Sequence, residues 1–220
     1  MKILIIGFPR SGTTLSYRIF QKHPQINGML FERQSLKKSK TKEHLIKRYP
    51  LYKRKNCGEK VIWEKRVMGK IGIGDKFDII DYANRWNDFF GKEARIIQIV
   101  RHPYDSLNSL VMSKKRLPRG PGFNLVYKEY LANASRFFEG LYSIPNCLTI
   151  KYETLIEDSE QTIKKYYSHC NLDVNHKHPE KMKKGRVFNY KEKDFLFKYD
   201  KRLHDIIHTL NKLPGVKYEL

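Results

Sequence analysis

Residues 3–15 read ILIIGFPRSGTTL, an apolar run that enters a short turn and continues into a helix-compatible stretch. A strand, a turn bounded here by Gly7 and Gly12, and a helix in this order present backbone N–H groups to a phosphate. The spacing nearly fits the nucleoside-triphosphate loop G-x-x-x-x-G-K-[ST], but Thr13 stands in the lysine position and Arg10 is the only cation inside the loop. The stretch therefore predicts a phosphate-binding loop that lacks the point charge for the β- and γ-phosphates of a nucleoside triphosphate.

Composition indicates a folded and strongly basic protein. The chain has 220 residues, of which 40% are hydrophobic, and this length favours one domain spanning residues 1–220. Its 44 Lys and Arg against 23 Asp and Glu give a formal net charge of +21, which draws in anions and raises their encounter rate. On charge alone, nucleic acid, anionic lipid, a phosphate-rich cofactor and an acidic polysaccharide all remain open as partners.

The cysteines Cys57, Cys147 and Cys170 are widely spaced and form no C-x-x-C pair. This favours a reducing compartment over a disulfide framework or a zinc site. The first strand begins directly after Met1, which leaves no room for a signal peptide, and no apolar run approaches the ~18 residues of a membrane-spanning helix. We expect a cytoplasmic protein without a membrane span.

Short apolar runs alternate with helical patterns along the chain. The runs that indicate buried strands are residues 2–6, 60–63, 94–100 and 147–151. Helices are predicted after the first loop as far as His23-Pro24, and over residues 77–87, 123–142, 159–170 and 195–213. The alternation predicts an α/β fold, a single P-loop-like three-layer α/β/α domain with a mostly parallel central sheet, in which ligands bind at the carboxyl ends of the strands.

Residues 33–60 differ in kind, because they are rich in Lys and Arg and Glu43 is nearly the only acidic residue before Glu59. No run of Pro, Gly or Ser marks this segment as a linker. One interpretation is a basic insertion beside the ligand-binding site. The alternative is a solvated basic surface, which is what runs of charge usually form.

A second motif occupies residues 99–109, IVRHPYDSLNS, where a strand end is followed by a proline placed to begin a helix. Arg101 lies at the carboxyl end of the strand, and Ser109 follows about two helical turns later. Both side chains could converge on one anion. The isolated pattern is weak, but its combination with the first loop is specific.

Together, the two motifs resemble those of the sulfotransferases that use 3′-phosphoadenosine-5′-phosphosulfate. Residues 8–15, FPRSGTTL, are similar to the family's 5′-phosphosulfate loop, and residues 101–109 to its 3′-phosphate motif. Weaker likenesses extend along nearly the whole chain, at His23-Pro24 with Glu32-Arg33, at residues 63–65 and at residues 151–155. Arginine in the first loop makes the chain more similar to tyrosylprotein and bacterial sulfotransferases than to the cytosolic small-molecule enzymes.

The resemblance implies a set of donor-binding residues. Arg10 would contact the sulfuryl group and the bridging oxygen, and Tyr152 the adenine edge. The 3′-phosphate would be held by Arg101 and Ser109, with Arg186 of the basic residues 184–186 closing over it. Lys65 would reach the phosphosulfate from the second strand. The 5′-phosphate would lie among the remaining loop residues, Pro9, Ser11, Gly12, Thr13 and Thr14.

The resemblance also implies the chemistry of in-line sulfuryl transfer. This reaction asks the protein to align donor and acceptor and to neutralise charge that grows on the leaving oxygen, a role that suits the guanidinium of Arg10, with Lys65 beside it. Glu32 is the predicted base for the acceptor hydroxyl, with Glu64 and His102 as alternatives. A sulfuryl group carries less charge than a terminal phosphate, so no metal is expected. The nucleotide product would be 3′-phosphoadenosine-5′-phosphate.

Two other functions compete with this interpretation. A P-loop kinase for a nucleotide or metabolite would want a lysine at position 13 and a carboxylate for magnesium. A basic nucleic-acid-binding protein would account for the charge, but the chain shows no zinc-finger, RNA-binding aromatic or helix-turn-helix pattern. The motifs do not specify the acceptor hydroxyl, which could belong to a saccharide, a tyrosine or another molecule, although the basic segment favours an anionic one.

Overall fold

A computed structural model describes residues 1–8, 10–31, 35–39, 41–62, 79–113, 131, 134, 140, 144–176 and 201–219. Within these residues, a parallel five-stranded sheet forms the centre in the order β2-β3-β1-β4-β5. The strands are β1 (Lys2–Gly7), β2 (Met29–Phe31), β3 (Cys57–Ile62), β4 (Ala94–Val100) and β5 (Cys147–Lys151). The predicted α/β fold with a parallel sheet is confirmed.

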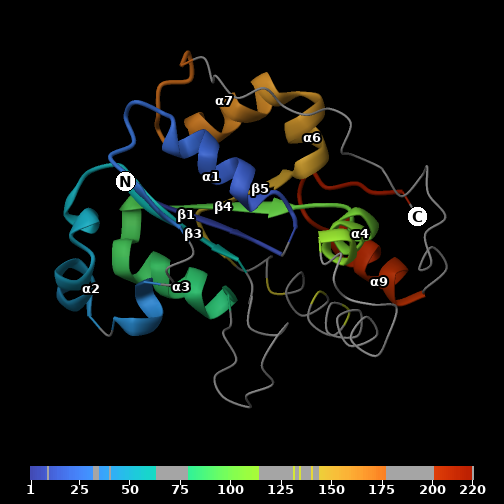
Figure 1. The fold of residues 1–220 in the computed structure, drawn as a ribbon, viewed down its shortest axis with the longest axis horizontal. Helices are drawn as coiled ribbons and strands as arrows, with labels where there is room; N and C mark the ends of the chain where they lie inside the picture. The colour runs from blue at the N-terminus through green and yellow to red at the C-terminus, as the bar shows by residue number, and fades with distance from the viewer. Residues whose placement is uncertain are drawn as a thin grey trace.

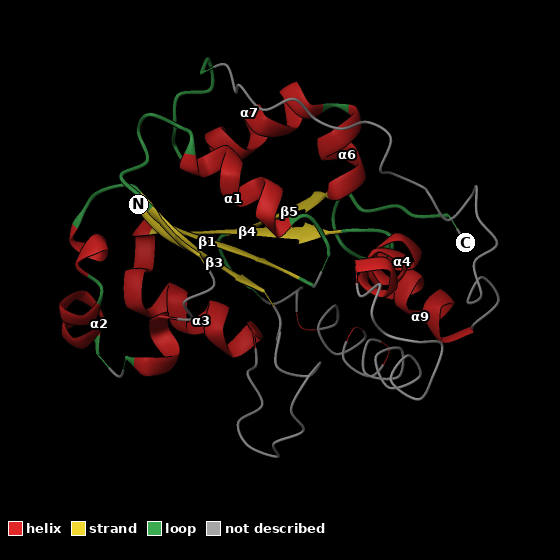
Figure 2. Cartoon of the chain, in the orientation of Figure 1, coloured by secondary structure: helices red, strands yellow, loops and turns green. Residues whose placement is uncertain are grey.

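Helices cover both faces of the sheet and produce the three layers seen in Figure 1 and Figure 2. One face carries α1 (Thr13–Gln21), α6 (Tyr152–Glu157) and α7 (Ser159–His169). The other side carries α2 (Lys42–Arg48), α3 (Ile79–Phe90), α4 (Pro103–Ser113) and α9 (Lys201–Leu210). Short 3₁₀ turns join some of these elements: η1 (Ser35–Lys38), η2 (Pro50–Lys53) and η4 (Gly91–Glu93).

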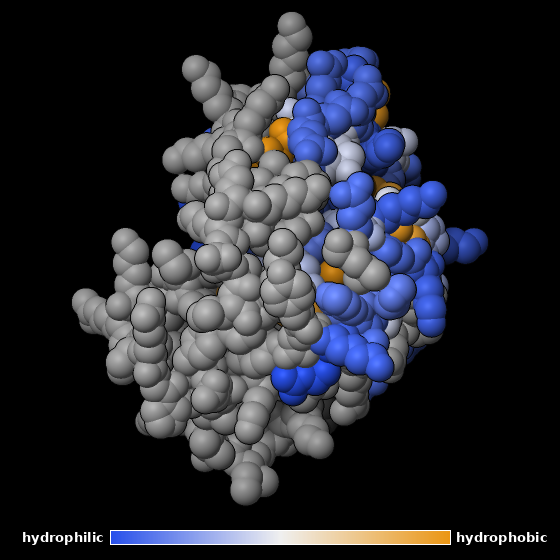
Figure 3. Space-filling model, turned by 90° about the vertical axis from the view of Figure 1, so that its right-hand side faces the viewer, coloured by the Kyte–Doolittle hydropathy of each residue, from blue (hydrophilic) through white to orange (hydrophobic). Residues whose placement is uncertain are grey.

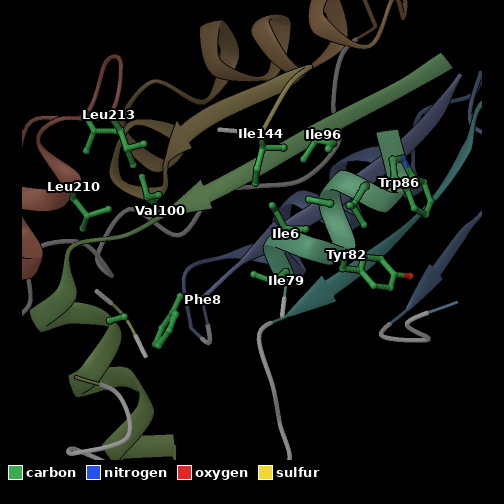
Figure 4. Packing of buried hydrophobic residues seen from close by; sticks show 14 of the residues in the cluster. Ile6, Phe8, Ile79, Tyr82, Trp86, Ile96, Val100, Ile144, Leu210 and Leu213 are labelled. Atoms are coloured by element: carbon green, nitrogen blue, oxygen red, sulfur yellow. The ribbon is translucent and has the colours of Figure 1, made fainter. Parts of the chain in front are cut away.

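Strand β1 is the middle strand, and all of its residues are buried, which explains its continuous run of Ile and Leu. Because side chains alternate along a strand, Ile3 and Ile5 join the core beneath α1 and α7, whereas Ile6 joins the core beneath α3. Figure 4 shows Ile6 on that second side, together with Tyr82 and Trp86 of α3. The two cores hold the sheet from both faces and fix where its strands end.

Some elements differ from the predicted ones. Strand β2 has no counterpart among the predicted strands, because it is three residues long and only partly buried. Strand β3 begins at Cys57, opposite Lys2 of β1, rather than at residue 60. Helix α6 follows β5 directly and spans six residues, too few to reveal a helical period in the sequence.

Where they are described, the predicted helices are confirmed. Helix α1 ends at Gln21, just before His23-Pro24, and α4 begins at Pro103 as predicted. Helices α3, α7 and α9 match the patterns predicted over residues 77–87, 159–170 and 195–213. Most of residues 123–142, and residues 195–200, lie outside the described residues.

The later half of the basic segment packs at the amino end of the sheet. From the start of β1, the ammonium of Lys2 donates to the backbone carbonyls of Tyr52, at 2.9 Å, and Arg54. Tyr52 and Leu45 of α2 are buried in the core. These residues therefore lie at the edge opposite to the strand ends where ligands bind. The proximity of the basic segment to an acceptor site stays a prediction for the residues that directly follow β2.

Candidate functional site

The loop after β1 exposes the start of a helix at the carboxyl edge of the sheet. It closes with a hydrogen bond from Ser11 N to Phe8 O at 3.1 Å, and Gly12 occupies the N-cap position of α1. Among the described residues, no side chain caps this helix start, and its first turn contains no acidic residue. The helix N-terminus therefore offers free N–H groups and the positive end of its dipole to an anion.

Both loop glycines are required by close contacts. A Cβ on Gly7 would lie 2.5 Å from Ser11 Oγ and 2.6 Å from Thr13 Cγ2, so both side chains fold in against β1. Gly12 has φ of +104°, which favours glycine, and a Cβ there would lie 2.3 Å from the ring of Tyr152. The structure thus brings Tyr152, at the start of α6, directly onto the loop.

Arg10 joins the two motifs. Its Nε donates to Ser109 Oγ on α4 at 3.0 Å, and its backbone carbonyl accepts from Nη1 of Arg101 at 3.2 Å. The backbone of Arg10 has a left-handed φ of 68°. The first loop and the Arg101–Ser109 motif therefore meet, as predicted from their positions at neighbouring strand ends.

Arg101 is buried where β4 ends, between an aromatic ring and a carboxylate. Its guanidinium lies 4.5 Å from the ring centroid of Tyr152 and 3.7 Å from the carboxylate of Asp105. Guanidinium groups stack on aromatic rings while keeping their charge. The resemblance assigns Arg101 to the 3′-phosphate and Tyr152 to the adenine. The two side chains are thus in contact with each other.

Lys60 belongs to the site, although no short motif of the sequence marks it. Its residue is 1% exposed in β3, its Nζ donates to Thr14 Oγ1 at 3.0 Å, and the same Nζ lies 3.8 Å from the ring centroid of Phe31. The predicted strand starts at residue 60, which places this lysine at a strand end, whereas in the structure it lies inside β3. One feature could have revealed it: Lys60 is a lysine inside a strand that pairs with a neighbour on each side. A charge buried there requires a partner.

A second buried carboxylate, Glu153 of α6, joins the end of β4 to the segment after α9. Glu153 Oε1 accepts from His102 N at 2.9 Å, and Glu153 Oε2 accepts from the Tyr218 hydroxyl at 3.0 Å. Burial raises the pKa of Glu153, while these hydrogen bonds and the charge of Arg101 act in the opposite direction. The carboxyl group is therefore committed to holding neighbouring backbone in place.

The same region argues against His102 as the base for the acceptor. Its Nδ1 accepts from Tyr104 N at 3.3 Å, and its Nε2 lies 3.3 Å from the carbonyl oxygen of Glu219, which can only accept. Nε2 therefore carries the proton and the ring has no lone pair left for a substrate. With an exposed fraction of 0%, His102 is a structural residue of the strand end.

Several predicted site residues lie outside the described residues: Pro9, Glu32, Glu64, Lys65 and Arg186. Their roles stay predictions. In the described part of the chain, no cluster of three or more His, Cys, Asp and Glu could hold a metal ion. No helix within that part has the length and apolarity needed to cross a membrane.

The strand ends face one side of the molecule, to the right in Figure 1. Figure 3 views this side, and the described residues that it shows are mostly hydrophilic. The uncapped start of α1, with Arg10, Arg101 and Lys60 close by, can bind a multiply charged anion.

Comparison with known protein families matches the sulfotransferase domain to residues 1–212. Among solved structures, the sulfotransferase domain from the Synechococcus PCC 7002 olefin synthase has a TM-score of 0.64 and 12% identity, covering 100% of this chain and 96% of that one. The sulfotransferase domain from the curacin biosynthetic pathway gives 0.63 and 12%, with coverages of 99% and 98%. A sulfotransferase from Alicyclobacillus acidocaldarius gives 0.59 and 13%, with 95% and 93%. At these identities the likeness concerns the fold, and no curated protein matches the chain.

Proposed function

Because the chain belongs to the sulfotransferase domain family, we propose that it transfers a sulfuryl group from 3′-phosphoadenosine-5′-phosphosulfate to an acceptor hydroxyl. The observation that carries the proposal is the junction of two motifs at one strand edge, where Arg10 contacts both Ser109 and Arg101. The donor carries anionic groups at both ends of its ribose. The cations of the two motifs must therefore lie no farther apart than these two groups.

The residues present fit this donor. The start of α1 has no side-chain cap and no acidic residue in its first turn, which suits a 5′-phosphate. Ser11 is 1% exposed, and its hydroxyl has no hydrogen-bond partner within the described residues, so the loop has spare polar capacity. Arg101 and Tyr152 supply a guanidinium for the 3′-phosphate and a ring for the adenine.

Binding requires a rearrangement of Arg10. The proposed roles place Arg10 at the sulfuryl end and Ser109 at the 3′-phosphate end, whereas the structure joins the two side chains at 3.0 Å. Arg10 is exposed and can rotate about several bonds. We expect the donor to replace the contact between Arg10 and Ser109 with separate contacts to its two ends.

The donor supplies an activated sulfuryl group. The residues of the chain align donor and acceptor and neutralise the charge that develops during transfer. Arg10 stabilises the negative charge that grows on the leaving oxygen, and Glu32 takes the proton of the acceptor hydroxyl. Thr14 Oγ1 accepts from Lys60, so its own O–H is free to point toward the 5′-phosphate. Lys60 therefore orients a phosphate-binding hydroxyl as well as adding positive charge.

The first test is ligand-induced stabilisation. Adenosine 3′,5′-diphosphate at ~100 times its dissociation constant should stabilise the protein by ~2.7 kcal/mol. For a chain of this length, this corresponds to a rise in Tm of roughly 5–10 °C. ATP at the same concentration should raise Tm much less. A larger rise with ATP would support the kinase alternative and contradict the proposal.

The second test is transfer of labelled sulfate from the donor to a panel of saccharide, phenol and alkyl hydroxyls, neutral and acidic. The net charge of +21 supports an anionic acceptor. Strong binding of the diphosphate without transfer to any hydroxyl would contradict the enzymatic part of the proposal.

We also place the protein in a reducing compartment, the cytoplasm. All three cysteines are free thiols in the structure, and burial raises the pKa of Cys147 and of Cys170 to about 12. Such thiols are poorly reactive because little thiolate forms near neutral pH.

A further inference from the structure

The segment after α9 returns to the carboxyl edge of the sheet. In Figure 4, Leu210 and Leu213 lie near Val100, at the end of β4. Residues 213–219 lie beyond the part of the chain that the family comparison matches, which ends at residue 212. Leu213, Val216 and Tyr218 are nevertheless buried. The segment is therefore an integral part of the core next to the donor site.

Tyr218 is held in a defined position. Asn211 fixes its backbone with two hydrogen bonds, from Asn211 Nδ2 to Tyr218 O at 2.9 Å and from Tyr218 N to Asn211 Oδ1 at 2.6 Å. The ammonium of Lys151 lies 4.7 Å from the centroid of its ring, and the ring of His102 lies 5.1 Å away on an edge. These contacts direct the Tyr218 hydroxyl to Glu153 Oε2 at 3.0 Å.

Glu153 transmits this position to Arg101. Its other oxygen accepts from His102 N at 2.9 Å, the amide that directly follows Arg101 in the chain. The same His102 ring contacts the carbonyl of Glu219 at 3.3 Å. Two contacts from the segment, one through Glu153 and one direct, thus converge on the residue next to Arg101.

We propose that residues 216–219 form a strap that positions Arg101 for the 3′-phosphate of the nucleotide. This inference rests on the proposed function. Tyr218 is a positioning residue, because it acts through Glu153 and His102 and not through contact with the donor. Loosening the strap should weaken binding of nucleotides in proportion to their use of Arg101, which a purely structural contribution would not do.

The readout is the ratio of two dissociation constants measured by calorimetry, for adenosine 5′-phosphate and adenosine 3′,5′-diphosphate. This ratio reports the contribution of the 3′-phosphate alone. In Tyr218→Phe, loss of one hydrogen bond should lower the ratio about fivefold, the equivalent of about 1 kcal/mol. Thermal unfolding would confirm that the variant is folded.

Tyr167→Phe is the matched control. Tyr167 is a buried tyrosine of α7 whose hydroxyl has no hydrogen-bond partner within the described residues. This variant should keep the wild-type ratio. Asn211→Ala loosens the strap without touching Glu153 and should lower the ratio in the same direction, which keeps the test open if Tyr218→Phe does not fold.

An unchanged ratio in the folded strap variants would overturn the strap while leaving the proposed function intact. A wild-type protein that binds the diphosphate no more tightly than adenosine 5′-phosphate would instead overturn the proposed function, and the strap with it.

Discussion

The two halves of the sheet's carboxyl edge are built differently. Around β1, β4 and β5, side chains from successive strand ends interlock, as Arg101 does with Tyr152 and Glu153 with His102. Around β3 and β2, Lys60 contacts Thr14 and Phe31, and Phe31 remains 45% exposed on a three-residue edge strand. We infer that the first half recognises the nucleotide, and we propose that the second half, where the Phe31 ring is exposed, faces the acceptor.

The largest effect is expected from a substitution in the acceptor half. Glu32→Gln should lower kcat by ~10²–10⁴-fold, because general-base catalysis contributes on this order. It should leave the dissociation constant of adenosine 3′,5′-diphosphate unchanged, since the nucleotide half is untouched. Glu43→Gln, at an exposed acid of α2, is the control and should keep wild-type kcat. Wild-type turnover in Glu32→Gln would assign the base elsewhere, with Glu64 the next candidate.

The next effect breaks the nucleotide half. Arg101→Met removes a charged hydrogen-bond donor and should weaken the binding of adenosine 3′,5′-diphosphate roughly 10- to 100-fold. Adenosine 5′-phosphate should be affected much less in the same calorimetric titrations. If both nucleotides weaken equally, Arg101 serves the loop as a whole and not the 3′-phosphate.

A smaller effect tests the boundary between the halves at Lys60. Lys60→Met should weaken the binding of both nucleotides about three- to tenfold, because the orientation of the Thr14 hydroxyl toward the 5′-phosphate is lost. Lys2→Met is the matched comparison, since Lys2 is also a buried lysine of the sheet but lies at its amino end. It should lower Tm without changing nucleotide affinity. Equal affinities in Lys60→Met and wild type would remove Lys60 from the donor site.

The smallest effect concerns the exposed ring of Phe31. Phe31→Ala should raise KM for the acceptor about two- to tenfold, as expected for loss of one aromatic contact, with little change in the affinity for the nucleotide. Phe31→Tyr should stay near wild type. A change in nucleotide affinity larger than the change in acceptor KM would place Phe31 in the donor half.

The fold could be predicted from the sequence largely because its central parallel strands, β1 and β4, are buried on both faces. The runs that became β1, β4 and β5 are apolar enough to recognise, and Pro103 marks the start of α4. Strand β2 could not be found this way, because three partly buried residues carry no period. The length of α6 hides it for the same reason.

The site divides along the same line. Short motifs with strict spacing identified Arg10, Arg101 and Ser109, and the structure brings these residues together. Lys60 and Tyr218 were missed because their partners lie far away in the chain, at Thr14 and Glu153. Contacts of this kind depend on the register of the sheet and on the path of the chain after α9, which no local pattern encodes.

The left-handed backbone of Arg10 sets two requirements of the protein against each other. A residue with a side chain at φ of 68° gives up about 1–2 kcal/mol of folding free energy that glycine would retain. A glycine at this position would thus relax the loop and remove the guanidinium on which sulfuryl transfer is proposed to depend. Thermal stability alone would favour glycine at this residue, whereas the proposed sulfuryl transfer favours arginine.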